Sequence, residues 1–241
     1  MSIGHEVRKL LWKVGFDISR FTPECHPFAR MRQLLRAYDI DTVLDIGANS
    51  GEFAQLLRRE LGYAKRIISF EPLNSAFALL KAKADRDPYW EVFNVALGDL
   101  EEESEINIAG NSYSSSLLDM LPSHLKSAPD STYRGKERVK IKRLDSVFDR
   151  LCSEPSRVYM KIDTQGFESN VLKGADNSLR RINSVQMEMS LVPLYRGELL
   201  FTELYSLMKE KGYNLVAILP GFSDESSGEL LQVDGIFHRS E

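Results

Sequence analysis

The amino-acid sequence predicts a doubly wound α/β fold, in which helices cover both faces of a mostly parallel sheet. An apolar run at residues 42–47 leads into a turn with two glycines, Gly47 and Gly51, and then into residues at helical spacing. Strand and helix patterns keep alternating after that turn, which requires parallel strands joined by crossover helices. The 241 residues, 43% of them hydrophobic, are enough for the core of one domain.

The expected strands and helices follow one another in order over residues 41–241. The strands lie at 42–47, 66–70, 90–97, 157–162, 184–189, 213–219 and 230–239, and the helices at 74–84, 145–151, 168–181 and 201–211, besides one that contains Phe53. Because no helical pattern separates the last two strands, we expect them to be antiparallel neighbours.

An insertion at about 101–142 interrupts this alternation. Residues 105–109 and 139–144 have the pattern of two paired strands, and a polar loop at 111–116 lies between them. Long insertions in compact domains are often lids or binding loops. We therefore expect residues 114–118 near the ligand, whereas residues 122–138 fit a binding loop and a surface excursion equally well.

Residues 1–40 are expected to form a helical cap ahead of this domain. A first helix at 5–18 has an apolar face, and a second helix follows at 27–38. Between residues 1 and 36 the chain has seven Lys or Arg residues and three Asp or Glu residues. The first helix could therefore rest on an anionic membrane surface, and packing over the sheet or the substrate pocket is the alternative.

Composition narrows the class of protein. The formal net charge of −4 argues against a nucleic-acid binder that works through bulk positive charge. Cys25 and Cys152 have neither metal-ligand spacing nor a disulfide framework, which suits a reducing compartment. No apolar run reaches the roughly 18 residues that span a bilayer, and the first residues lack a cleavable signal pattern. We expect a cytoplasmic protein without a nucleic-acid partner.

Glycines and acidic residues stand where the predicted strands end. Ligands of open α/β sheets bind beyond these carboxyl ends, which here carry residues 45–51, Glu71, Gly98-Asp99, Asp163 and Glu188. Glu71 follows the glycine turn by about 20 residues, where a carboxylate can accept hydrogen bonds from ribose hydroxyls. Taken alone, that position suits NAD as well.

The first turn argues against NAD. Gly47-Ala48-Asn49-Ser50-Gly51 lacks the full glycine pattern of a dinucleotide site, and the strand before it carries Asp45. A negative charge beside the turn disfavours a pyrophosphate. It suits a ligand with a cationic end, such as the ammonium and sulfonium groups of S-adenosylmethionine.

Seven motifs in order resemble those of FkbM-type S-adenosylmethionine-dependent methyltransferases. They are Val43-Leu44-Asp45-Ile46-Gly47-Ala48-Asn49-Ser50-Gly51, Phe70-Glu71-Pro72, Ala96-Leu97-Gly98-Asp99, Ser114-Ser115-Ser116-Leu117, Arg143-Leu144-Asp145-Ser146, Lys161-Ile162-Asp163-Thr164-Gln165-Gly166-Phe167-Glu168 and Val171-Leu172-Lys173-Gly174-Ala175. Each motif is weak alone, but the ordered set is specific and covers roughly residues 41–238. Gln165 departs from the pattern, which has Glu at that position.

The resemblance implies a class I methyltransferase (Rossmann-like) fold, with seven strands and an antiparallel last strand. It also implies O-methylation of a hydroxyl, often on a sugar of a surface polysaccharide, a glycolipid or a glycosylated natural product. By motif position, the cofactor-binding residues would be Asp45, Gly47, Ala48, Asn49 and Gly51 at the methionine part, Glu71 at the ribose, Val95, Ala96 and Asp99 near the adenine, and Asp163.

The acceptor hydroxyl needs a base or a metal ion to lose its proton. Asp163 and Glu188, at neighbouring strand ends, could bind a divalent cation such as Mg²⁺, or Asp163 could be the base itself. His26 lies in a segment that could fold over the cofactor and is the third catalytic candidate, although a structural role is the more ordinary one.

Two other classes of function stay open at this level. One is a nicotinamide-dependent oxidoreductase, which NAD(P)H rather than S-adenosylhomocysteine would stabilise. The other is a non-catalytic, surface-associated module that binds through the basic N-terminal helix. A small-molecule or glycan acceptor is the expected partner, and a homo-oligomer is compatible with the sequence, but the acceptor itself is not specified by these residues.

Overall fold

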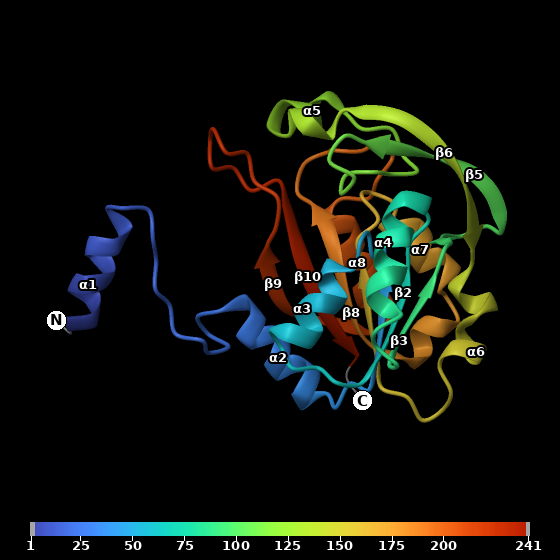
Figure 1. Ribbon diagram of the computed structural model, residues 1–241, viewed down its shortest axis with the longest axis horizontal. Helices are drawn as coiled ribbons and strands as arrows, with labels where there is room; N and C mark the ends of the chain where they lie inside the picture. The colour runs from blue at the N-terminus through green and yellow to red at the C-terminus, as the bar shows by residue number, and fades with distance from the viewer. Residues whose placement is uncertain (1–2, 240–241) are drawn as a thin grey trace.

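A seven-stranded sheet forms the centre of the computed structural model, which describes residues 3–239 (Figure 1). The strands run in the order β3-β2-β1-β7-β8-β10-β9. They are β1 (Thr42–Ile46), β2 (Arg66–Phe70), β3 (Trp90–Phe93), β7 (Val158–Ile162), β8 (Ile182–Ser190), β9 (Tyr213–Pro220) and β10 (Gln232–Arg239). β10 is antiparallel to both of its neighbours, and the other pairs are parallel. The predicted class I methyltransferase topology is confirmed.

Helices cover both faces of the sheet because successive side chains of its strands point to opposite sides. α2 (Pro27–Ala37), α3 (Glu52–Arg59) and α4 (Asn74–Ala84) pack on the face that holds Val43. α6 (Phe148–Leu151), α7 (Glu168–Gly174) and α8 (Phe201–Glu210) pack on the face that holds Leu44 (Figure 1). Two apolar layers therefore enclose β1, and every residue of this strand is buried.

The predicted third strand, 90–97, divides into two short strands that belong to different sheets. β3 ends at Phe93, and β4 (Ala96–Leu97) pairs with β6 (Tyr133–Lys142) instead of continuing the main sheet. Between them, the Asn94 amide donates to the carbonyl oxygens of Glu71 and Pro72 at 3.0 and 2.9 Å. These hydrogen bonds hold Asn94 against the end of β2, and the chain leaves the main sheet there.

The predicted helix 168–181 is also interrupted. α7 ends at Gly174, and a separate 3-10 turn occupies Ser178–Arg181. The carboxylate of Asp145 accepts hydrogen bonds from the backbone N–H and the hydroxyl of Ser178 at 2.8 and 2.7 Å. This side chain from another segment fixes where the turn begins, which the apolar pattern of the helix does not reveal.

The insertion forms a second, three-stranded sheet with the order β4-β6-β5. β5 (Glu102–Ala109) and β6 are antiparallel, so the predicted strand pair is present, although both strands begin earlier than expected. Helix α5 (Pro122–Ser127), which the sequence did not predict, lies in the segment that connects them. Figure 1 shows this segment above the end of the main sheet toward which β8 points.

Helix α1 (Ile3–Trp12) stands apart from the sheet and from the helices that cover it (Figure 1). The predicted helix 5–18 ends early because the chain folds back at Asp17, whose carboxylate accepts hydrogen bonds from the Arg8 guanidinium and the Trp12 indole. α1 thus covers neither the sheet nor a pocket. Within residues 3–239, no helix combines the length and the apolar character needed to cross a membrane.

His124 of α5 is buried, and its Nδ1 atom has no hydrogen-bond partner among the described residues 3–239. The imidazole contacts the rings of Tyr195 and Phe222, whose centroids are 5.2 and 5.3 Å from its own. Burial lowers the pKa of His124 to about 4. The neutral imidazole therefore serves as one of the apolar contacts that hold the α5 segment on the domain.

We expect acid to destabilise the protein through His124. In the unfolded chain, His124 is protonated below its ordinary pKa of about 6.5. In the folded chain, the imidazole stays neutral until about pH 4. Stability is therefore lost as the pH falls between these values, by at most about 3 kcal/mol. Urea unfolding between pH 7.5 and 4.5 should show this loss in the wild-type protein and not in His124→Phe. Since carboxyl groups also titrate, the readout is the difference between the two proteins, and parallel pH curves would contradict the expectation.

Candidate active site

A pocket of about 260 Å³ opens at the carboxyl ends of β1, β2, β7 and β8. The insertion forms one wall, with Ser112, Tyr113, Ser115 and Leu117. The predicted site residues that line the pocket are Gly47, Asn49, Glu71, Val95, Ala96, Asp163 and Glu188. Residues far apart in the chain thus meet at one place, as the position of strand ends predicted.

The turn after β1 packs tightly against the turn after β7. Gly47 has a φ of +80°, and a Cβ there would lie 1.9 Å from the carbonyl oxygen of Asp163. Gly51 has a φ of +90° at the start of α3, and its Cβ would lie 2.7 Å from the ring of Trp90. Neither position accepts a side chain. Ala48 is buried in the core, so it and Gly51 shape the turn without lining the pocket.

Asp45 is fully buried inside β1 and does not line the pocket. Its Oδ2 atom accepts a hydrogen bond from the Ser69 hydroxyl at 3.2 Å, and its Oδ1 atom has no hydrogen-bond partner within the described part of the chain. Burial raises the pKa of Asp45 to about 6, against the favourable charge of Lys161. The strand continues through Ile46, which does line the pocket. Because side chains alternate along the strand, Asp45 points away from the face of Ile46, and its role at the methionine part of the cofactor stays a prediction.

Glu71 joins the turn after β1 to the turn after β2. One carboxylate oxygen accepts a hydrogen bond from the backbone N–H of Asn49 at 2.8 Å, and the other accepts one from Leu73 at 2.9 Å. Burial raises the pKa of Glu71 to about 7 despite these bonds. The carboxyl group therefore fixes two pocket-lining turns and still presents lone pairs to the pocket.

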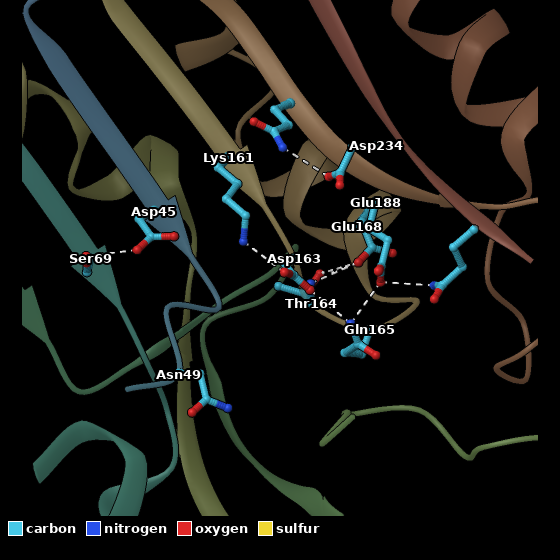
Figure 2. Close-up of polar contacts among 12 residues, drawn as sticks. Asp45, Asn49, Ser69, Lys161, Asp163, Thr164, Gln165, Glu168, Glu188 and Asp234 are labelled. Carbon is cyan, nitrogen blue, oxygen red and sulfur yellow. Dashed lines mark hydrogen bonds and ion pairs between the residues drawn. The ribbon is translucent and has the colours of Figure 1, made fainter. Parts of the chain in front are cut away.

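An amide bridges the two carboxylates at the ends of β7 and β8 (Figure 2). The Gln165 side chain donates from Nε2 to Asp163 at 2.9 Å and to Glu188 at 2.8 Å. The Lys161 ammonium binds the other oxygen of Asp163 at 2.8 Å. Gln232 donates to the same Glu188 oxygen as Gln165 does, at 2.9 Å. These side chains make one polar network under the pocket.

The network shifts the pKa values of its two carboxyl groups, Asp163 and Glu188, in opposite directions. Burial opposes ionisation of Asp163, yet the charge of Lys161 and its hydrogen bond, with that of Gln165, hold the pKa below its usual value. Burial and the neighbouring charges of Asp163, Glu168 and Asp234 raise the pKa of Glu188 well above its usual value. Two carboxyl groups whose pKa values are pushed apart are suited to different roles in acid–base chemistry.

Comparison with protein families gives the site its context. A model of the methyltransferase FkbM domain matches residues 45–215, which is most of the chain. The chain belongs to the FkbM methyltransferase family. This confirms the resemblance and the prediction of an S-adenosylmethionine-dependent methyltransferase. The oxidoreductase and the non-catalytic module are set aside.

Solved structures show distant similarity to this FkbM methyltransferase. The methyltransferase FkbM from Methylobacillus flagellatus KT has a TM-score of 0.49 at 14% identity, over 82% of this chain and 44% of that one. A putative S-adenosylmethionine-dependent methyltransferase from Listeria monocytogenes has a TM-score of 0.49 at 9% identity, over 89% and 98%. An rRNA methylase from Streptococcus thermophilus has a TM-score of 0.47 at 9% identity, over 90% and 98%. The chain spans less than half of the Methylobacillus protein, and no curated protein matches it.

The pocket of the FkbM methyltransferase fits the cofactor that its family implies. Glu71 presents a carboxylate suited to ribose hydroxyls, and Phe70, Val95, Ala96 and Leu97 provide an apolar wall suited to a purine ring. Gly47 and Asn49 line the same space from the turn after β1. The individual binding roles of these residues stay predictions.

The donor set does not fit the magnesium ion that the sequence suggested at Asp163 and Glu188. Their facing oxygens already accept hydrogen bonds from the amide of Gln165, and an N–H donor repels a cation. Residues 3–239 contain no group of three or more His, Cys, Asp or Glu side chains arranged for a metal ion. Hard cations usually take more oxygen ligands than these two carboxylates offer.

Two further predicted site residues lie outside the pocket of this methyltransferase. The His26 ring caps α2 by accepting a hydrogen bond from the Phe28 backbone at 3.2 Å and does not line the pocket, so its catalytic role has no support here. Asp99 accepts a hydrogen bond from the Asn170 amide at 3.1 Å and does not line the pocket. Both carboxylate and imidazole are used to fix helices, a role that sequence position alone does not distinguish from binding.

Sequence reasoning missed Lys161 and Gln232, which complete the polar network. Lys161 lies on β7 beside Asp45 of β1, and the charges of Asp163 and Asp45 raise its pKa although burial lowers it. The signal was present, because a lysine inside an otherwise apolar strand needs an anionic partner. Gln232 begins β10, which lies between β8 and β9 in the sheet, and no local sequence pattern marks it as a partner of Glu188.

We expect Glu71→Ala to weaken cofactor binding. The variant leaves the Asn49 and Leu73 N–H groups without their carboxylate acceptor and removes the group placed at the ribose. Affinity for S-adenosylhomocysteine, measured by calorimetry, should fall by about tenfold or more, since a hydrogen bond to a charged group contributes about 1.5–3 kcal/mol. Glu91→Ala, at a surface ion pair with Arg66, is the matched control. Unchanged affinity in a folded Glu71→Ala protein would contradict the assignment.

Proposed function

We propose that this FkbM methyltransferase methylates a hydroxyl oxygen of a sugar in a surface polysaccharide, a glycolipid or a glycosylated natural product. The observation that carries the proposal is the state of Glu188. One oxygen of its carboxyl group accepts hydrogen bonds from two amides, and the other, Oε1, accepts none from residues 3–239 although the residue lines the pocket. A free carboxyl oxygen in a ligand pocket can accept a proton from an acceptor hydroxyl.

The remaining wall of the pocket suits a polyhydroxylated acceptor. Ser112 and Ser115 line it from the insertion, and Thr164 and Gln165 line it from the turn after β7. A hydroxyl oxygen has two lone pairs, so those of Ser112, Ser115 and Thr164 can accept hydrogen bonds from sugar hydroxyls. A site built from such groups discriminates strongly against acceptors that lack these hydroxyls.

S-adenosylmethionine, when bound, supplies a methyl group activated by a positively charged sulfur. The protein must hold the acceptor oxygen in line with this group, and alignment of that kind can contribute on the order of 7–11 kcal/mol. Glu188 takes the hydroxyl proton through Oε1 while the acceptor becomes an ether. Its raised pKa makes it a stronger base than an ordinary carboxylate, and Asp163 stays ionised beside Lys161.

We expect Glu188→Gln to lose activity while it retains the cofactor. General base catalysis contributes typically about 10²–10⁴-fold, so kcat should fall within that range. Transfer of a labelled methyl group to a panel of glycans identifies the acceptor, and the same assay measures the variant. S-adenosylhomocysteine affinity should stay unchanged, as in the surface control Glu60→Gln. Activity of Glu188→Gln near the wild-type level, or labelling of no glycan but of an amine or thiol acceptor, would overturn the proposal.

We further propose that the N-terminal arm, residues 7–21, rests on an anionic membrane surface. Leu10, Val14, Phe16 and Ile18 are 64–69% exposed. Lys and Arg outnumber Asp and Glu by seven to three in the first 36 residues. An apolar face with basic neighbours is the combination that binds the boundary of an anionic bilayer. Such contact would place the enzyme beside a membrane-borne glycan acceptor.

Co-sedimentation with lipid vesicles tests the membrane proposal. The wild-type protein should bind vesicles that contain phosphatidylglycerol, bind those of phosphatidylcholine alone far less, and be released by salt. Leu10→Asp combined with Phe16→Asp should abolish binding and leave S-adenosylhomocysteine affinity unchanged. Sedimentation velocity without lipid tests the alternative, in which the arm binds a second copy of the chain and not a membrane. A stable dimer that these substitutions dissociate, with no binding to anionic vesicles, would show that a second copy of the chain covers the arm instead.

A further inference from the structure

The turn after β7 holds Gln165 in a conformation that a non-glycine residue seldom adopts. Its φ is +56°, in the left-handed region, and the next residue, Gly166, has a φ of +92°. A Cβ on Gly166 would lie 2.8 Å from the Cβ of Tyr195, so the turn is pressed against that side chain. Strained backbone of this kind persists where the surrounding structure specifies it, and it gathers at functional sites.

Every polar group of the Gln165 side chain has a defined partner. Its oxygen accepts a hydrogen bond from the Tyr195 hydroxyl at 2.7 Å, which leaves the nitrogen to face Asp163 and Glu188. The backbone carbonyl of Gln165 accepts another from the Ser116 hydroxyl of the insertion at 2.7 Å. The amide therefore has one orientation, with both N–H groups aimed at the two carboxylates, as Figure 2 shows.

The orientation of the Gln165 amide determines how the carboxyl group of Glu188 is held. Gln165 and Gln232 donate to the same oxygen, Oε2, and this fixes the rotation of the carboxyl group. Negative charge is stabilised at Oε2 by the two donors, so a proton taken up by Glu188 resides on Oε1, which has no hydrogen bond from the part of the chain that the structure describes. A divalent cation between Asp163 and Glu188 would fix both carboxylates in a similar way, but here a neutral amide occupies that place.

We infer that Gln165 is the positioning residue of the reaction, and that its amide replaces a bridging metal ion in orienting Glu188 toward the acceptor. This inference rests on the proposed role of Glu188 as the base. Tyr195 acts one step further out: the carboxylate of Asp163 requires the amide N–H groups on its side, and the Tyr195 hydroxyl then holds the amide oxygen in place. The enzyme consequently transfers the proton with its own side chains and needs no divalent cation.

Substitution of the amide by a carboxylate provides a gain-of-function test that does not depend on catalysis. Gln165→Glu places a third carboxyl group between Asp163 and Glu188, and clustered carboxylate oxygens are the ligands of hard divalent cations. Calorimetry and electron paramagnetic resonance with Mn²⁺ should show a bound ion in Gln165→Glu and none in the wild-type protein. Gln33→Glu, an exposed residue of α2, is the matched control for added charge. A wild-type site that binds Mn²⁺ in competition with Mg²⁺, or wild-type activity that EDTA abolishes, would overturn the inference.

Loss of the amide gives a second, kinetic test. In Gln165→Ala, kcat should fall by roughly 10–100-fold, the effect of one hydrogen bond to a charged group, with little change in KM for S-adenosylmethionine. Removal of a donor to the carboxylate also raises the pKa of Glu188, so the rising limb of the pH–rate profile should move to higher pH. Tyr195→Phe should shift it in the same direction by less. An unshifted profile in both variants would show that Gln165 is merely structural.

The two sets of measurements distinguish this inference from the proposed function. If Glu188→Gln stays active, the assignment of the base fails, while the Mn²⁺ measurements still decide whether the amide occupies a cation position. If Glu188→Gln is inactive but Gln165→Ala has a normal rate and pH profile, the base is correct and the positioning role is wrong. Thermal unfolding of each variant confirms that the compared proteins are folded.

Discussion

The contact between the turns after β1 and β7 is the constraint on which the rest of the site depends. A glycine at position 47 lets the first turn touch the carbonyl of Asp163, where any side chain would collide. Because the turns touch, Asn49 and Glu71 on one side and Asp163 and Gln165 on the other surround a single pocket. The two halves of a doubly wound sheet separate at this point, and the polar groups of both become available to one ligand.

The polar network beneath the pocket follows from the same geometry. Carboxylates at the ends of parallel strands are crowded and partly withdrawn from water, so each needs a cation or an N–H donor. The Lys161 ammonium binds Asp163, and the amides of Gln165 and Gln232 donate hydrogen bonds to Glu188. A charged partner holds one carboxylate ionised, whereas neutral partners leave the other able to take a proton. The difference in partners, rather than the carboxylates themselves, separates their chemistry.

The sequence was a good guide to the sheet and a weaker one to the site. Strand ends such as Glu71, Asp163 and Glu188 were identified correctly as pocket residues, because periodicity marks where a strand stops. Asp45 was placed correctly within the first strand, but the sequence did not show that its side chain lies buried beside Ser69 and Lys161 and does not line the pocket. The break in helix 168–181 and the amide bridge depend on Asp145 and Tyr195, contacts between segments distant in the chain. Local patterns do not contain such contacts, and neither does the departure of α1 from the domain.

In the proposed function, the cofactor and the acceptor contact two parts of the chain that are under different structural constraints. The cofactor side is built from turns with positive φ and backbone contacts, where few substitutions are sterically possible. The opposite wall comes from the segment between β5 and β6, which attaches to the site through hydrogen bonds such as the one from Ser116 to the carbonyl of Gln165. A backbone carbonyl accepts this bond whatever the neighbouring side chains are. The segment can therefore diverge in evolution, or be exchanged between homologous enzymes, and alter acceptor choice while the methyl-transfer machinery is inherited unchanged.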